Sequence, residues 1–178
     1  MLLNELVEVS RRVGETSSRT AKINLLSAAL RQMHSDEVAV GVAFLSGDIR
    51  QRKIGIGYAA IRDAQPESSA SHPTLQILDV DAALQRIADV APGAGSNRER
   101  LRLLRELLSR ATTDEQSFIA HLVFGELRQG ALEGIMLDAV ARAADIPATE
   151  IRRAHMLSGS LPGVAAAALI GGRSALSA

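Results

Sequence analysis

The sequence contains no cysteine and no tryptophan, and its aromatic residues are one tyrosine and three phenylalanines. Disulfides and thiolate metal sites are therefore excluded. The core has to be built from aliphatic side chains, which suits closely packed helices. Hydrophobic residues make up 47% of the 178 residues, enough for a folded core in one large domain or two small ones.

The chain also lacks a long uncharged run, a signal peptide and an excess of either charge. No apolar stretch reaches the length needed to span a membrane, and charged residues such as Glu5 and Arg11 interrupt the first 13 residues. We therefore expect a cytoplasmic protein. Twenty basic residues balance twenty acidic ones, and all the basic residues except Lys22 and Lys53 are arginine. Arginine suits bidentate phosphate contacts, although the codon usage of a GC-rich genome explains the same preference.

The patterns of familiar active sites are missing as well. The four histidines lie far apart and lack the paired spacing of metal ligands. There is no Walker loop and no G-x-S-x-G elbow. The segment Gly55–Ala60 is a weak match to a dinucleotide-binding loop, but it does not follow a clear strand. We predict no catalytic residue and no metal site in this chain.

Helical periodicity dominates the sequence, and no alternating strand pattern occurs. We predict an all-α fold, a single compact domain of about ten helices. The breaks are expected at 63–76, which reads "DAQPESSASHPTLQ", and at 92–97, "PGAGSN". Helices are expected near 2–9, after Ser17-Ser18, at 38–45, at 56–61, from Asp79 or Val80 to Ala91, at 98–111, after Thr113-Asp114, and at about 131–145, 148–157 and 163–170.

One local pattern occurs three times, each time where one helix is expected to end and another to begin. The three copies are "FLSGDIR" at 44–50, "LVFGELR" at 122–128 and "MLSGSLP" at 156–162. Glycine is the usual residue just past a helix end, so helix capping is one explanation. The other is that these turns aim backbone N–H groups at an anion, as in hairpins that bind DNA phosphates. The pattern alone leaves both explanations open.

The run "FIAHLVFGELRQGALEGIMLDAVARA", residues 118–143, resembles the N-terminal DNA-binding domain of ATP-dependent DNA ligases of the bacterial and archaeal type. The matching positions include Gly125, Leu127, Arg128 and Gly130, while Gln129 stands where that family usually has an aliphatic residue. The segments "SSRTAKINLLSAAL" (17–30), "VAFLSGDIRQRKIGIG" (42–57) and "SGSLPGVAAAAL" (158–169) are similar to other parts of the same domain. The resemblance covers residues 1–169.

The resemblance implies two pseudo-symmetric helical halves, about 1–62 and 77–170, joined by the loop 63–76. It also implies binding to nicked duplex DNA across the minor groove through backbone and phosphate contacts, in replication, repair and recombination. Neither lysine lies in the K-x-D-G motif that the family uses for adenylation. We therefore expect a non-catalytic fragment, with residues 171–178 beginning a linker to absent nucleotidyltransferase and OB-fold domains. ATP and Mg²⁺ are expected only for the full-length enzyme.

The resemblance and the repeated turns together name the residues expected to contact DNA. Arg19 and Lys22 are the weaker candidates, since a role in an intramolecular salt bridge explains them equally well. Gly134, inside the following helix, is attributed to close helix packing. The predicted DNA-binding residues are Gly47, Arg50, Lys53, Gly125, Arg128, Gly130, Ser158, Gly159, Gly163, Arg19 and Lys22.

Two other functions fit parts of the sequence. The segment "LPGVAAAAL" (161–169) resembles a helix-hairpin-helix motif of other repair proteins, although Ala165 replaces its usual second glycine. The strongly amphipathic segment 98–111 has a leucine stripe that suits a helical protein-interaction domain. Binding of single-stranded nucleic acid by base stacking is disfavoured because aromatic residues are so few.

Overall fold

The computed structural model describes residues 1–51, 54–125 and 132–177, and over these residues the protein is built from helices. Within these residues, the β-type pairing is an isolated antiparallel bridge between Leu2 and Gln76. The all-α prediction is confirmed. The helices are α1 (Leu3–Glu15), α2 (Arg19–Gln32), α3 (Val38–Leu45), α4 (Tyr58–Ala64), α5 (Ile77–Ala88), α6 (Ser96–Ser109), α7 (Thr113–Phe124), α8 (Leu132–Ala144), α9 (Ala148–Ser158) and α10 (Leu161–Ala166).

The helix boundaries follow local capping chemistry. Ser18 caps α2 by accepting a hydrogen bond from the Ala21 N–H, as the sequence predicts. The cap of α7 is Thr112, one residue before the predicted pair, and its hydroxyl accepts from the Glu115 N–H. The N-cap of α4 is Gly57, so α4 starts at Tyr58, slightly later than expected. In contrast, α5 starts earlier than expected, at Ile77.

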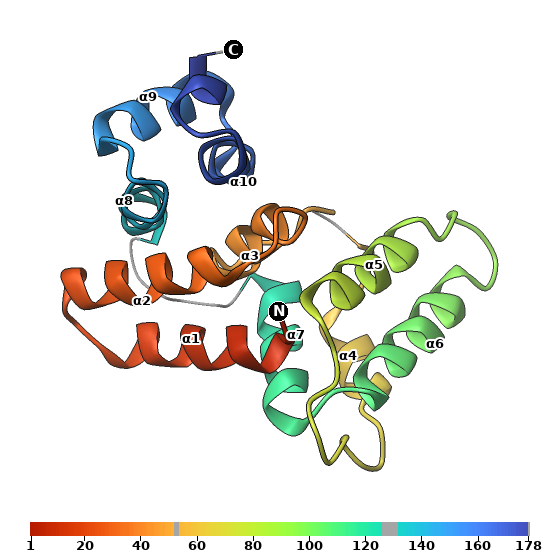
Figure 1. Ribbon diagram of the computed structural model, residues 1–178. Helices are drawn as coiled ribbons and strands as arrows, with labels where there is room; N and C mark the ends of the chain where they lie inside the picture. Colours follow the sequence, from red (N-terminus) through yellow and green to blue (C-terminus); the bar gives the residue numbers. More distant parts are fainter. Residues whose placement is uncertain (52–53, 126–131, 178) are drawn as a thin grey trace.

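The helices form three groups along the molecule (Figure 1). The helices α1, α2, α3 and α7 occupy the middle, α4, α5 and α6 one end, and α8, α9 and α10 the other. The most extensive packing joins α2 to α8 and α3 to α10. Helices from the two predicted halves therefore pack directly on one another, while the pseudo-symmetry of those halves stays a prediction.

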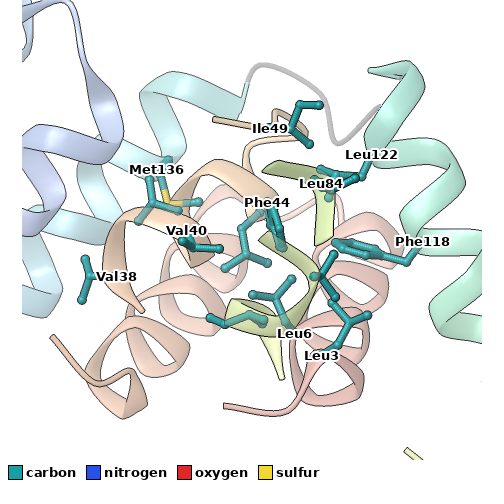
Figure 2. Close-up of a cluster of buried hydrophobic side chains, with 14 of the residues drawn as sticks. Leu3, Leu6, Val38, Val40, Phe44, Ile49, Leu84, Phe118, Leu122 and Met136 are labelled. Atoms are coloured by element: carbon teal, nitrogen blue, oxygen red, sulfur yellow. The ribbon is translucent and has the colours of Figure 1, made fainter. Parts of the chain in front are cut away.

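The core is largely aliphatic and includes two buried phenylalanines, Phe44 and Phe118. Phe44 of α3 is fully buried, and Figure 2 shows it among side chains contributed by α1, α5 and α7. The same buried cluster continues through Met136 of α8. Because α3 lies in the middle of this cluster, the turn that follows it is held on a rigid support.

The leucine stripe of 98–111 belongs to this core. Leu103, Leu104, Leu107 and Leu108 are buried where α6 packs against α4 and α5. The stripe is therefore not free to dock a partner protein, and that part of the protein-interaction hypothesis is wrong.

The segment after α10 also folds onto the protein. The backbone widens into a π-helical turn at Ala167–Gly171, and Arg173–Ser177 forms a short 3-10 helix. Arg173 donates to Glu150 of α9 at 2.6 and 2.7 Å. A linker role for 171–178 stays a prediction.

Candidate nucleic-acid interface

The first glycine turn follows α3 and carries Arg50. Gly47 has a φ of 78°, and its N–H donates to the Phe44 carbonyl at 3.0 Å. The Asp48 N–H donates to the Ala43 carbonyl at 2.9 Å, and Ile49 is buried. Backbone hydrogen bonds to α3 and the buried side chain of Ile49 therefore hold the turn in place. The next residue, Arg50, lies at the surface.

Arg50 is held by a carboxylate from another helix. Its Nε donates to Asp81 Oδ1 of α5 at 3.0 Å, and its Nη2 donates to Oδ2 of the same residue. Gln51 donates to that Oδ1 as well, at 3.0 Å. The hydrogen bonds that Arg50 donates to Asp81 raise the pKa of Arg50 above its ordinary value. A guanidinium has five N–H donors, so an Arg50 oriented in this way keeps donors for a further acceptor.

The last glycine turn joins α9 to α10. Gly159 has a φ of 65°, and its N–H donates to the His155 carbonyl at 2.8 Å. The Ser158 hydroxyl accepts from the Ser160 N–H, and the Ser160 hydroxyl accepts from the Gly163 N–H, both at 3.2 Å. Two serine hydroxyls and the exposed Gly163 therefore lie within one tight turn.

The first and last turns line the same cleft, because α10 packs on α3. The cleft has a volume of about 620 Å³. Beside it, His155 Nε2 of α9 lies 3.1 Å from Glu133 Oε1 of α8. The polar residues and glycines that line the cleft are Ser46, Asp48, Arg50, Glu133, His155, Gly159, Ser160 and Gly163.

The middle glycine turn lies apart from this lining. Gly125 ends α7 with a φ of 67°, and its N–H donates to the Leu122 carbonyl at 3.2 Å. Next to it, Phe124 stacks on the largely exposed Tyr58 with ring centroids 4.3 Å apart. The predicted contacts Lys53, Arg128 and Gly130 lie outside the described residues.

The capping explanation holds for all three described turn glycines, Gly47, Gly125 and Gly159. Each takes a left-handed conformation at a helix end, and each N–H donates back to its own helix. These three amides are therefore occupied. If a phosphate binds at these turns, its partners are the neighbouring side chains and amides.

Arg19 and Lys22 start α2 and have partners within the protein. Arg19 Nη2 donates to Asp138 Oδ2 of α8 at 2.7 Å and lies 3.4 Å from the Gly134 carbonyl oxygen. Lys22 also makes an interaction within the chain. Positive charge at the start of a helix opposes the helix dipole. The carboxylate of Asp138 compensates that charge for at least one of these two residues, Arg19.

The carboxylates that orient these arginines could not be predicted from any local motif. Asp81 lies 31 positions from Arg50, and Asp138 lies 119 positions from Arg19. Arg152 of α9, which also donates to Asp138, was not among the predicted site residues. Each pairing is created by helix packing, so no local motif marks it.

Residues 1–51, 54–125 and 132–177 were also compared with the requirements of a metal site and of a membrane-spanning helix. That part of the chain contains no group of three or more His, Asp or Glu side chains that could hold a metal ion. None of its helices is long and apolar enough to cross a membrane.

Comparisons with known proteins give one consistent result. The family model described as "DNA ligase N terminus" matches residues 58–141. The chain is 51% identical to a probable DNA ligase of Anaeromyxobacter sp. (strain Fw109-5), over 99% of this chain and 34% of that protein. Probable DNA ligases of Mycolicibacterium paratuberculosis and Rhodococcus jostii are 50% and 46% identical over the whole chain, which covers 34% and 35% of their lengths. The chain thus spans about a third of the curated relatives that it matches.

Proposed function

Because the chain belongs to the DNA ligase N-terminus family, we propose that it is the part of a DNA ligase that binds duplex DNA. The observation that carries this proposal is the cleft at which the first and last glycine turns meet. Besides the carboxylates of Asp48 and Glu133, the cleft is lined by an arginine and by serine hydroxyls, which suit contacts to the sugar-phosphate backbone. Sequence-independent binding is part of the proposal.

The finer proposal is that the chain binds nicked duplex DNA across the minor groove. Arg50 is oriented by Asp81 toward the surface beside the cleft, and bidentate guanidinium contacts are the strongest available to a phosphate. Gly159 and Gly163 line the other side of the cleft, and Ser158 lies in the same turn. The N–H groups of both glycines are occupied within the protein, so the serine hydroxyls are the proposed partners of the phosphate there. Arg128 and Gly130 are proposed to extend the contact beyond the described residues.

Adenylation is proposed to belong to the remainder of a longer ligase. The two lysines of this chain, Lys22 and Lys53, are followed by "INL" and "IGI", which do not fit the K-x-D-G motif. The described residues also include no cluster of carboxylates or histidines for a metal. ATP and Mg²⁺ would act in the nucleotidyltransferase and OB-fold domains, and this chain would hold the DNA for them.

The test is a titration of the 178-residue chain with nicked and intact duplexes of one sequence, followed by fluorescence anisotropy at several salt concentrations. The affinity should fall steeply as salt rises, because binding releases counterions. Arg50→Ala and Arg128→Ala should each lower the slope of log affinity against log salt by about one unit. Preference for the nicked duplex would favour the ligase function over another helix-hairpin-helix module.

Arg102 of α6 offers a matched control for Arg50. Its side chain is 59% exposed against 49% for Arg50, and it too is paired with carboxylates, Glu99 and Glu106. Arg102→Ala should leave the salt slope unchanged. If the wild-type chain bound neither duplex at low salt, the proposed function would be wrong.

A further inference from the structure

One carboxylate on α8 holds two arginines from two other helices. Asp138 Oδ2 accepts from Arg19 of α2 at 2.7 Å, and Asp138 Oδ1 accepts from Arg152 of α9. The carboxylate is largely buried, with 18% of its side chain exposed, whereas the two guanidiniums are 56% and 44% exposed. The negative charge therefore lies beneath two positive charges that face solvent.

Among the residues that the structure describes, this cluster joins two arginines to one carboxylate and so carries one net positive charge, unlike another exposed ion-pair cluster of the same protein. On α1, Arg11 lies between Glu8 and Glu15, so that cluster carries one net negative charge. Arg11 is 56% exposed, the same as Arg19. An ion-pair cluster that only stabilises helix packing does not need an excess of arginine. An excess does leave attraction for an anion, and five donors on each guanidinium provide hydrogen bonds for it.

Arg19 also contacts the backbone of α8. Its Nη2 donates to the Gly134 carbonyl at 3.4 Å as well as to Asp138. A Cβ built at Gly134 would lie 3.9 Å from the same nitrogen, an ordinary contact, and no other atom lies within 4 Å of it among the described residues. The close helix packing expected at Gly134 is therefore wrong, and the position of Arg19 depends on the two acceptors.

The cluster and the proposed DNA-binding cleft share two helices. Glu133 and His155, which line the cleft, belong to the same two helices as Asp138 and Arg152. His155 follows Arg152 by three residues on α9, which places both on one face of the helix. A backbone that occupies the cleft therefore has a short path along α8 and α9 to the arginines.

We propose that Arg19 and Arg152, held together by Asp138, form a second phosphate-binding site for the duplex that occupies the cleft. This inference rests on the proposed function. Asp138 is a positioning residue: it fixes the two guanidiniums, and it weakens their attraction for a phosphate by its own charge. Two arginines from different helices bind one phosphate with several charge-assisted hydrogen bonds.

The experiment measures the salt dependence of nicked-duplex affinity for Arg152→Ala, Arg19→Ala and Arg11→Ala, beside the wild-type chain. Each phosphate contact contributes a slope of about 0.9. From about 50 mM to about 200 mM salt, wild-type affinity should therefore fall roughly 3.5-fold more than that of either cluster variant. Arg11→Ala should behave like the wild type. Arg152→Lys should also keep the wild-type slope, because it keeps the charge.

Asp138→Asn separates a phosphate site from a purely structural cluster. Removal of the carboxylate charge should raise affinity for the duplex and keep or steepen the salt slope, even if thermal stability falls. The proposal is overturned if the cluster variants lower stability but keep the wild-type slope, or if Asp138→Asn changes neither affinity nor slope. It is also overturned if Arg152→Lys loses the same slope as Arg152→Ala. Absence of salt-dependent binding by the wild type would instead refute the proposed function, and this inference with it.

Discussion

Substitution of two glycines by alanine should change stability in opposite directions, although both lie at the α8–α10 end of the protein. Gly159 ends α9 with a φ of 65°, and nothing lies within 4 Å of a Cβ built there. The cost of Gly159→Ala is therefore backbone strain alone, about 1 kcal/mol for a left-handed L-residue. Gly134 lies inside α8, and the nearest atom to a built Cβ is Arg19 Nη2 at 3.9 Å, an ordinary contact. Gly134→Ala should therefore stabilise the helix by about 0.8 kcal/mol.

The two variants should differ by about 2 kcal/mol, which is a difference in Tm of about 4–8 °C for a chain of this size. Thermal unfolding followed by circular dichroism measures it, with the wild type expected between them. If both variants shifted Tm in the same direction, either the capping role of Gly159 or the free space for a side chain at Gly134 would be wrong.

Three further variants test the core, the arginine support and a buried ion pair. Asp81→Asn should cost about 1–3 kcal/mol in denaturant unfolding, because Asp81 is 8% exposed and accepts from Arg50. It should also raise duplex affinity, because a negative charge beside Arg50 is removed, and an unchanged affinity would contradict the place of Arg50 at the DNA. Phe44→Ala should cost about 3–5 kcal/mol, since Phe44 is fully buried, and a cost below about 1 kcal/mol would contradict its central place in the core. Burial opposes the charge of Glu37, but hydrogen bonds from the Met1 ammonium and a backbone N–H outweigh it and hold the pKa of Glu37 below its ordinary value. Its stabilising effect is therefore complete at neutral pH and is lost as the pH falls below the ordinary value of 4.5 and through the lowered pKa. Glu37→Gln should flatten that acid limb of the unfolding curve, and an unchanged limb would refute the pairing.

The helices could be predicted from the sequence because their signals are local. Ser18 and Thr112 are capping residues next to the helices they start, and leucines repeat at helical spacing along α6. The repeated glycine turns were found for the same reason. The protein-interaction alternative for α6 was wrong. An amphipathic pattern predicts that one face is buried, but it does not indicate whether the protein's own core or a partner covers that face.

The candidate site could be predicted only in part, because its geometry depends on contacts between distant segments. Arg50, Gly159 and Gly163 were identified from their turns, but nothing in those turns shows that α10 packs on α3 and brings them to one cleft. Asp81 and Asp138 became visible only through packing. The same packing shows that Arg19 has a partner within the protein.

The most direct test of the central claim is an NMR titration of the ¹⁵N-labelled chain with a nicked duplex at low salt. The account predicts that the amide signals that change most belong to the two turns beside the cleft, Ser46–Arg50 and Ser158–Gly163, with smaller changes at Arg19 and Arg152. The amides of α6 should stay unchanged. Perturbations centred on α4–α6, with the two turns unaffected, would contradict the claim that this cleft binds DNA.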